Sequence, residues 1–203
     1  MDPLFDIGTY LDQFSAPSRK SADAENLFSD KRRAWHAVKT EEARCDFAAD
    51  RFRLNARGIM FLSLWKRSVY GRTLTEIKSD DNMPARISSG ISPFITRILG
   101  ESLNSGGWAI ITPPPRRHPE NNFAVRCADL ISRALGIPFR RDVCRARNRQ
   151  RVNAEFDLIS PPDENNLIVF DDIVTTGSTF IAMDKVLKPL GKVCLYVTAI
   201  NNK

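Results

Sequence analysis

The chain has 203 residues, 42% of them hydrophobic and 27% charged, a composition that fits one ordinary globular domain with room for a small appendage and excludes a disordered or fibrous protein. No apolar run approaches the roughly 20 residues that a membrane helix needs, so no membrane contact is expected. The formal net charge of +6 favours an anionic partner.

The first 57 residues are predicted to form a helical N-terminal arm or hood region. Residues 1–20 show no clear periodicity and are expected to lie as an arm over the domain. Residues 21–57 contain no glycine or proline and repeat apolar residues at helical spacing, which predicts one or two amphipathic helices. Gly58 ends this pattern, and the apolar run over residues 59–65 predicts a buried strand.

A longer helix is predicted next. Polar residues 80–82 followed by Pro84 give a helix start signal, and the pattern predicts a helix over residues 84–99. Because Pro93 falls inside it, this helix is expected to be broken or shifted there. The sequence Asn-Ser-Gly-Gly at residues 104–107 predicts a turn.

After this turn, apolar runs alternate with helical patterns. Such alternation favours an α/β fold, a mostly parallel doubly wound sheet with helices on both faces, over residues 58–203, with residues 1–57 as a helical N-terminal extension. In such sheets ligands bind at the carboxyl ends of the strands. The predicted elements are strands over residues 108–112, 137–144, 167–170 and 192–200, helices over 121–135 and 180–190, and a long loop over 145–166.

The positive charge is concentrated in residues 116–151. This window contains ten arginines, no lysine and three acidic residues, a net charge of +7, while the rest of the chain sums to −1. Arginine is preferred over lysine where phosphate or carboxylate is held by two hydrogen bonds at once. The window is therefore interpreted as an anion site, with an arginine-rich solvated surface as the alternative.

The cysteines give no sign of a metal or disulfide framework. Cys45, Cys127, Cys144 and Cys194 are widely spaced, without a C-x-x-C pair or a neighbouring histidine, so structural zinc is not expected. Residues 1–9 carry acids and lack the pattern of a secretory signal. Reduced thiols in the cytoplasm are the expectation.

The most informative segment is residues 167–179, Leu-Ile-Val-Phe-Asp-Asp-Ile-Val-Thr-Thr-Gly-Ser-Thr. Its apolar start predicts a buried strand that brings Asp171 and Asp172 to the carboxyl end, where they can accept hydrogen bonds from sugar hydroxyls or face a metal. The loop of small hydroxyl residues then opens a helix, and backbone N–H groups and hydroxyls there suit a phosphate monoester. Together these features predict a ribose 5-phosphate site.

An apolar strand that ends in two acids is also found as the Walker B strand of nucleoside triphosphatases. That interpretation requires a G-x-x-x-x-G-K-[ST] loop, which the sequence lacks. The dinucleotide-binding pattern G-x-G-x-x-G is also missing. Both alternatives therefore lose most of their support.

Residues 167–179 resemble the motif by which type I phosphoribosyltransferases bind phosphoribosyl pyrophosphate (PRPP). In that family an apolar strand and two acids precede a Thr-Thr-Gly-x-Thr loop. The resemblance implies that Asp171 and Asp172 hold the ribose hydroxyls and the metal. Hypoxanthine-guanine-type members carry an Asp where Thr175 stands, so that subgroup is disfavoured. The resemblance assigns the 5-phosphate to Thr175, Thr176, Gly177, Ser178 and Thr179.

A second segment resembles the ComF-like branch of this family. Residues 110–117, Ile-Ile-Thr-Pro-Pro-Pro-Arg-Arg, resemble its pyrophosphate-side loop, and residues 122–124 resemble the segment that follows. The resemblance implies that Arg116 and Arg117 are catalytic residues at the diphosphate, together with Asp171 and Asp172, and that Pro115 binds the substrate, because a rigid proline run can aim two guanidiniums at a diphosphate. A plain rigid turn is the alternative.

Three more residues are implied by the same resemblance. Residues 64–66, Leu-Trp-Lys, resemble a Leu-Lys-Tyr element, which implies a substrate contact for Lys66; an ordinary lysine at a strand end is the alternative. The arginine-rich loop over residues 145–153 takes the place of the hood that closes over the substrate, which implies contacts for Arg147 and Arg149. For these arginines a solvated loop is the alternative.

The resemblance implies a glycosyltransferase of the pentosyltransferase class that moves ribosyl 5-phosphate from PRPP to a nitrogen nucleophile, a nucleobase or related acceptor, with release of pyrophosphate. It also implies Mg²⁺ as cofactor and a cytoplasmic homo-oligomer. The chain lacks the zinc module of many ComF-like proteins, which leaves two other roles open. One is an effector of a bacterial retron or antiviral defence system, controlled by a nucleoprotein partner, a reverse transcriptase with its DNA. The other is a regulator that binds PRPP without turnover.

Overall fold

The computed structural model describes residues 43–54, 58–115, 122–148 and 153–203. These residues belong to one compact unit, Ala43–Lys203. The predicted arm and the part of the helical prediction over residues 21–42 lie outside the described residues.

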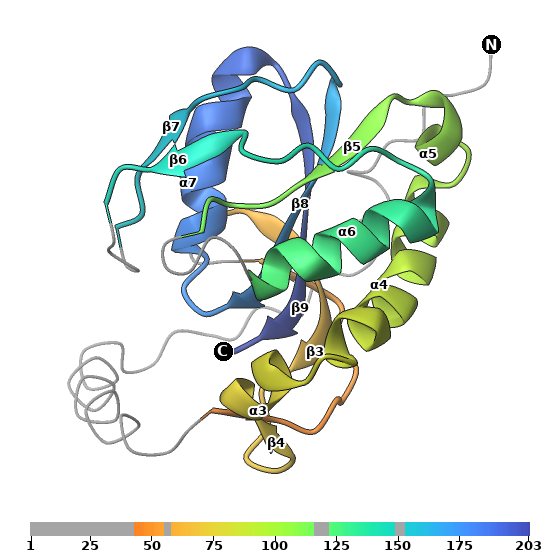
Figure 1. Cartoon of the computed structure of the whole chain (residues 1–203), viewed down its shortest axis with the longest axis vertical. Coiled ribbons are helices and arrows are strands. Elements are labelled where there is room, and N and C mark those ends of the chain that lie inside the picture. Colours follow the sequence, from red (N-terminus) through yellow and green to blue (C-terminus); the bar gives the residue numbers. More distant parts are fainter. Residues whose placement is uncertain (1–42, 55–57, 116–121, 149–152) are drawn as a thin grey trace, which may run out of the picture. The chain divides into compact units, whose positions relative to one another are not determined.

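A five-stranded sheet in the order β2-β3-β9-β8-β5 forms the centre of this unit (Figure 1). Its last four strands run parallel, and β2 pairs antiparallel with β3 at one edge. Parallel strands are covered on both faces, which explains why they appear in the sequence as continuous apolar runs. The predicted α/β fold with a mostly parallel sheet is confirmed. The strands are β2 (Phe52–Leu54), β3 (Met60–Lys66), β5 (Trp108–Ile111), β8 (Asn166–Val174) and β9 (Val193–Asn201).

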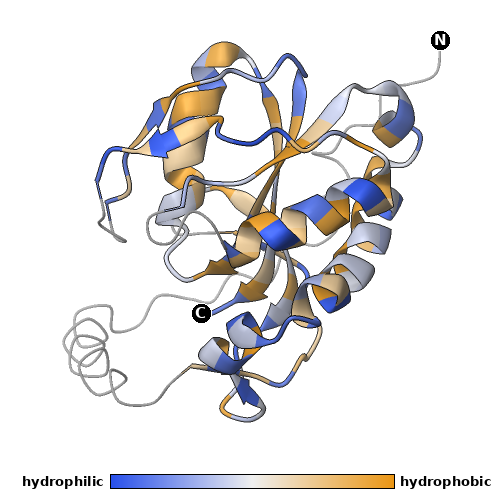
Figure 2. Cartoon of the chain, in the orientation of Figure 1, coloured by the Kyte–Doolittle hydropathy of each residue, from blue (hydrophilic) through white to orange (hydrophobic). Residues whose placement is uncertain are grey.

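Helices cover both faces of the sheet, as predicted. α4 and α6 lie side by side on one face, and α7 lies on the other (Figure 1). Hydrophobic residues are concentrated in the central strands and on the helix sides that face them (Figure 2). Among the described helices, none is both long and apolar enough to cross a membrane. The helices are α3 (Leu74–Ser79), α4 (Met83–Leu99), α5 (Ser102–Ser105), α6 (Phe123–Leu135), α7 (Ser178–Leu187) and the 3-10 helix η2 (Lys188–Leu190).

Successive side chains of β8 point to opposite faces of the sheet. Ile168 and Phe170 pack in the core cluster that contains the buried residues of α4 and α6. Leu167 and Val169 pack in the cluster that contains those of α7. This alternation determines which face the polar residues at the carboxyl end of the strand will meet.

The helical prediction for residues 43–54 is wrong. These residues form β1 (Arg44–Cys45), which pairs with β4 (Arg72–Thr73), and β2, which pairs with β3. In the segment that connects β1 to β2, the Asp50 N–H donates a hydrogen bond to the Leu64 carbonyl of β3 (2.9 Å). Pairing with neighbouring strands gives the backbone N–H and C=O groups of both segments hydrogen-bond partners. The stability gained from this pairing outweighs the weak helical preference of the sequence.

The predicted break at Pro93 does not occur, and α4 runs through it without interruption. Proline cannot donate the hydrogen bond to the carbonyl four residues earlier, which here belongs to Ser89. Both Pro93 and Ser89 are exposed. Water can therefore satisfy the Ser89 carbonyl, and the helix continues.

The prediction for residues 137–166 is partly wrong. Of the strand predicted over residues 137–144, only Phe139 forms a bridge, to Ile110 of β5, before β6 (Cys144–Ala146) begins. The predicted loop instead contains β7 (Phe156–Leu158), which pairs antiparallel with β6. Three-residue strands in a polar segment give almost no periodic signal, so this hairpin was not predicted.

Helix α3, which was not predicted from the sequence, begins at a capping box. Thr73 Oγ1 accepts a hydrogen bond from the Glu76 N–H (3.2 Å), and the Glu76 carboxylate accepts one from the Thr73 N–H (2.7 Å). The pattern Thr-x-x-Glu is a known sequence signature of a helix start. It could have revealed this helix.

Thr73→Ala is expected to lower the free energy of unfolding by about 1 kcal/mol, because the cap of α3 is lost. Ser79→Ala is the matched control, since its hydroxyl donates to the Glu76 carbonyl at the other end of the helix and does not cap its start. The control is expected to change stability by less than about 0.5 kcal/mol. Denaturant unfolding of both variants measures the difference, and equal losses would contradict the capping role.

Candidate functional site

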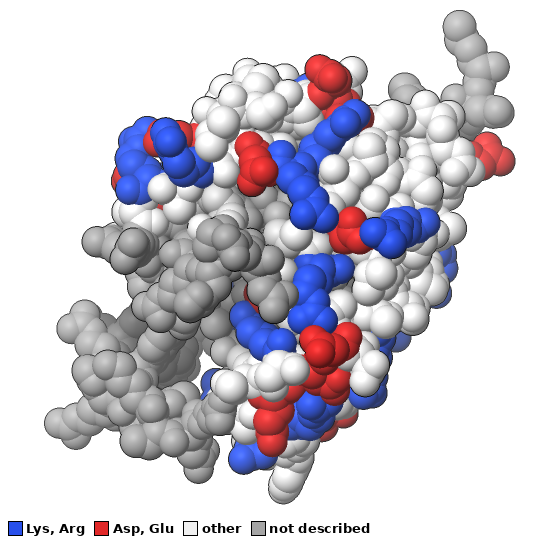
Figure 3. All heavy atoms as spheres, viewed as in Figure 1, with Lys and Arg blue, Asp and Glu red and all other residues white. Residues whose placement is uncertain are grey.

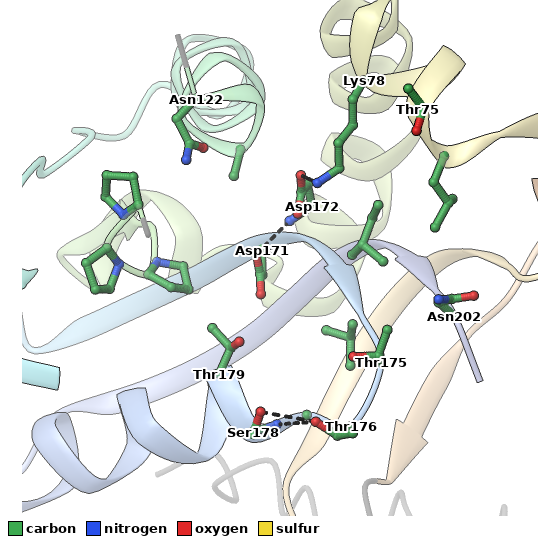
Figure 4. Close-up of a pocket in the computed structure, with 18 residues that line it drawn as sticks. Thr75, Lys78, Asn122, Asp171, Asp172, Thr175, Thr176, Ser178, Thr179 and Asn202 are labelled. Carbon is green, nitrogen blue, oxygen red and sulfur yellow. Dashed lines mark hydrogen bonds and ion pairs between the residues drawn. The ribbon is translucent and has the colours of Figure 1, made fainter. Parts of the chain in front are cut away.

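A pocket of about 490 Å³ lies at the carboxyl end of β8 (Figure 4). This is the edge of the parallel sheet at which a ligand site is expected. Its walls come from α3, the loop after β5, the start of α6, the end of β8 with the loop into α7, and the chain after β9. The lining residues are Leu74, Thr75, Lys78, Pro113, Pro114, Pro115, Asn122, Ala124, Asp171, Asp172, Ile173, Val174, Thr175, Thr176, Gly177, Ser178, Thr179 and Asn202.

Eight residues that the sequence assigned to a site line this pocket. They are the two acids at the end of β8, the five residues of the loop into α7, and one proline after β5. The structure brings together Asp171, Asp172, Thr175, Thr176, Gly177, Ser178, Thr179 and Pro115.

The two acids point to different sides of the pocket. Following the alternation of β8, the Asp171 side chain turns toward the α7 side, where Thr179 lies, and the Asp172 side chain turns toward α3 (Figure 4). Asp172 Oδ2 lies 2.6 Å from the Lys78 ammonium. The Asp172 N–H donates to Asp171 Oδ1 (3.0 Å). Only the Asp171 carboxylate therefore faces the hydroxyl-rich loop.

The loop between β8 and α7 has the geometry of a tight turn into a helix. Gly177, the residue before the helix, has φ +74°, a left-handed conformation that glycine adopts without strain. Thr176 Oγ1 accepts a hydrogen bond from the Ser178 N–H (3.3 Å) and lies 3.1 Å from Ser178 Oγ. The first turn of a helix carries backbone N–H groups without helical partners and the positive end of the dipole. Together with the hydroxyls, this arrangement suits a phosphate group.

The opposite wall of the pocket is formed by the prolines after β5 and by the start of α6 (Figure 4). Asn122 caps α6, since its side-chain oxygen accepts a hydrogen bond from the Val125 N–H (3.2 Å). The expected diphosphate ligands Arg116 and Arg117 follow these prolines directly and lie outside the described residues.

Other expected site residues are not brought into the pocket. Lys66 is the last residue of β3, exposed and aligned with Asn201 of β9, and does not line the pocket. Arg147 follows β6 and forms an ion pair with Asp157 of the same hairpin. Arg149 lies outside the described residues.

Most of the described arginines of residues 116–151 are already paired with acids. Five of the six form ion pairs, and blue and red side chains adjoin across this face of the molecule (Figure 3). In the Arg140–Glu164 ion pair, the hydrogen bond from Arg140 holds the pKa of the Glu164 carboxyl below its ordinary value. For these arginines the alternative of a surface cluster describes the structure better than an anion site. The pairs are Arg126–Asp81, Arg133–Asp129, Arg140–Glu164, Arg141–Asp129 and Arg147–Asp157.

Sequence reasoning missed the wall that α3 and the C-terminus contribute. Leu74, Thr75 and Lys78 come from α3, and Asn202 follows β9. Among the described lining residues, Lys78 is the only lysine or arginine. The capping box could have predicted the helix, but no local pattern indicates that its last turn meets the end of β8.

The pocket offers carboxylate oxygens rather than a complete metal site. The described residues contain no group of three or more His, Cys, Asp or Glu that could hold a metal by themselves. Carboxylate and hydroxyl oxygens are nevertheless the ligands that Mg²⁺ prefers, and it usually shares them with substrate phosphates. The donor set therefore fits a Mg²⁺ ion held jointly by the protein and an anionic ligand.

Cys127 of α6 is fully buried and lies close enough to Asp172 to be affected by its charge. Burial raises the pKa of its thiol well above the ordinary value, and the Asp172 charge raises it further. Both effects favour the protonated thiol, whereas the thiolate is the reactive form.

No protein-family model and no curated protein sequence matches this chain. Among solved structures, an orotate phosphoribosyltransferase from Aeropyrum pernix is similar at a TM-score of 0.45 and 14% identity, covering 82% of this chain and 80% of that one. An adenine phosphoribosyltransferase from Saccharomyces cerevisiae is similar at a TM-score of 0.44 and 16% identity, and the match covers 74% of this chain and 82% of that one. An adenine phosphoribosyltransferase from Leishmania tarentolae is similar at a TM-score of 0.44 and 10% identity, and the match covers 82% of this chain and 86% of that one. Each TM-score is below 0.5, so the proposed function depends on the pocket itself.

Proposed function

We propose that this chain is a PRPP-dependent phosphoribosyltransferase that transfers ribosyl 5-phosphate to a nitrogen nucleophile and releases pyrophosphate. One observation carries the proposal. The Asp171 carboxylate and the hydroxyl-rich loop before α7 line the same pocket, at the carboxyl end of a parallel sheet. A carboxylate that accepts hydrogen bonds from a vicinal diol, beside a phosphate cradle without a described basic side chain, suits a ribose 5-phosphate.

The ligand would lie along the end of β8. Its 5-phosphate would take hydrogen bonds from the loop residues 175–179, and its ribose hydroxyls would donate to Asp171. The diphosphate on its anomeric carbon would then extend toward the side of the pocket where Lys78 and Asn122 lie, and the prolines after β5 lead there to Arg116 and Arg117 in the sequence. Adjacent guanidiniums are suited to a diphosphate because each can donate two parallel hydrogen bonds.

The reaction needs positioning and charge stabilisation more than covalent help from the protein. The bond between the anomeric carbon and the diphosphate oxygen breaks, and its electron pair leaves with the diphosphate. The nucleophile's nitrogen lone pair forms the new bond to carbon, and the nitrogen then loses a proton. Asp171 would keep a negative charge beside the sugar ring while positive charge develops there.

Mg²⁺ would be held by Asp171 and Asp172 together with oxygens of the substrate. When bound, it would neutralise part of the diphosphate charge and so favour its departure. The chain's own side chains do the remaining work of binding the phosphate and orienting the ribose.

Incubation of the full chain with Mg²⁺, PRPP and a panel of nucleobases tests the proposal, with pyrophosphate release as the measurement. Release that depends on one class of base would support transfer and identify the acceptor. Binding of PRPP without release for any base would favour a regulator that binds PRPP. Absence of both binding and release would overturn the proposal.

The alternative role with a nucleoprotein partner has less support, because five of the six described arginines in residues 116–151 are paired with acids. Arg116→Ala combined with Arg117→Ala is expected to weaken PRPP binding more than DNA binding, since the two guanidiniums would serve the diphosphate. Titrations of the double variant with PRPP and with DNA give the ranking. The opposite ranking would favour the nucleoprotein partner. The homo-oligomer and the cytoplasmic location stay predictions.

A further inference from the structure

Lys78 occupies a position in the pocket that the motif of residues 167–179 does not explain. It lies in the last turn of α3, and its ammonium is 2.6 Å from Asp172 Oδ2. The Lys78 side chain is 44% exposed, whereas that of Asp172 is only 14% exposed. The lysine end of this ion pair is therefore open to solvent, while the carboxylate end is mostly buried.

The helix that carries Lys78 is fixed at both of its ends. The capping box of Thr73 and Glu76 holds its start, and the Arg72 guanidinium forms an ion pair with Asp80, the residue after its end (2.6 Å). The Lys78 side chain itself has four rotatable carbons and three donors that can be redirected. A change of partner therefore needs only a rotation of the side chain, not a movement of α3.

Lys78 lies at the end of the pocket opposite to the loop that is expected to hold the 5-phosphate. Lys78 and Asn122 lie on one side of Asp171, and Thr176 and Ser178 lie on the opposite side (Figure 4). If a 5-phosphate occupies the loop before α7 and the ribose lies over Asp171, the anomeric substituent points toward Lys78. In PRPP that substituent is a diphosphate, and Lys78 is the only cationic side chain among the described residues that line the pocket.

We propose that Lys78 is a substrate-binding residue that exchanges its ion pair with Asp172 for the diphosphate of PRPP, and thereby frees the Asp172 carboxylate for the ribose and its metal. This inference rests on the proposed function and adds to it. It explains how Asp172, whose carboxylate is paired in the free protein, can become available to the ligand that Asp171 binds. In the free protein Lys78 balances Asp172, and in the complex the ligand supplies new partners for both charges.

Isothermal titration calorimetry with three ligands in the presence of Mg²⁺ tests the exchange. Lys78→Met is expected to raise the Kd for PRPP and for pyrophosphate by about 10- to 100-fold, the loss of a charge-assisted contact. The Kd for ribose 5-phosphate is expected to change by less than about threefold, because that ligand lacks the diphosphate. Lys78→Arg keeps the charge and should restore part of the affinity.

Lys185→Met is the matched control, since Lys185 is an exposed lysine of α7 that does not line the pocket. It is expected to leave all three Kd values unchanged. The unfolding transition of each variant is measured as well, and a half-exposed ion pair such as Lys78–Asp172 is expected to contribute at most about 1 kcal/mol to it.

A double-mutant cycle separates a contact with the ligand from an effect through Asp172. In the Asp172→Asn background the ion pair is already lost. If Lys78 contacts the diphosphate, adding Lys78→Met will still weaken pyrophosphate binding about tenfold or more. If it acts only by holding Asp172, the addition will have no effect, and the inference is wrong. A wild-type chain that binds neither PRPP nor pyrophosphate would overturn the proposed function and this inference together.

Discussion

Asp171→Asn is expected to weaken PRPP binding by about 10- to 100-fold without unfolding the chain. Hydrogen bonds to an ionised carboxylate contribute about 1.5–3 kcal/mol, and every 1.4 kcal/mol is about tenfold in affinity. Asparagine has nearly the same shape and keeps the oxygen that accepts the Asp172 N–H. Adding Asp172→Asn is expected to reduce binding below detection, because the second carboxylate is then lost as well. Calorimetric titration with PRPP and Mg²⁺ measures both effects.

Asp163→Asn provides the comparison, because Asp163 is an exposed acid of the chain that does not line the pocket. Its affinity for PRPP should equal that of the wild type. All variants should unfold in one cooperative transition of similar midpoint. Undiminished binding by the Asp171→Asn, Asp172→Asn double variant would show that the ribose site lies elsewhere.

The part of the fold around the proposed site could be predicted because its determinants are local. The apolar run of β8, the two acids, the small hydroxyl residues and the helix α7 follow one another within residues 166–187. A strand buried on both faces must be apolar, and a turn at positive φ requires a residue such as Gly177. Each of these constraints acts on neighbouring residues, so the sequence carries them directly.

The strands in residues 43–54 could not be predicted in the same way. This segment, with its Phe47, Ala48 and Phe52, matches a helical pattern, yet β2 pairs with β3 and Cys45 is fully buried in the core. The edge of the sheet decides its conformation, because β2 pairs there with β3, whose other side pairs with β9. The partner of β1, which is β4, lies about 30 residues further along the chain, and strands as short as β1 and β2 leave no periodic signal in the segment itself.

The electrostatics of the site also depended on distant partners. Residues 116–151 carry a net charge of +7 in the sequence. In the structure, Asp81, Asp157 and Glu164 from outside this window pair with Arg126, Arg147 and Arg140. Conversely, Lys78 belongs to a segment with no unusual charge and becomes the pocket's described cation through the position of α3. Net charge along the chain therefore does not show which arginines are paired with acids or which lysine lines the pocket, whereas the three-dimensional arrangement shows both.

Gly177→Ala is expected to raise the Kd for ribose 5-phosphate by about tenfold or more. At φ +74° an added Cβ costs about 1–2 kcal/mol, and the turn can relieve this strain by relaxing away from the geometry that presents the hydroxyls and the first turn of α7 to the phosphate. Gly191→Ala is the matched control. Gly191 has φ +68° and does not line the pocket, and a Cβ added to it would have no atom within 4 Å. Both variants should lose similar stability in denaturant unfolding, but only Gly177→Ala should lose affinity for ribose 5-phosphate in calorimetry. Since both glycines have similar positive φ angles, equal affinities in the two variants would mean that the loop before α7 does not bind the 5-phosphate.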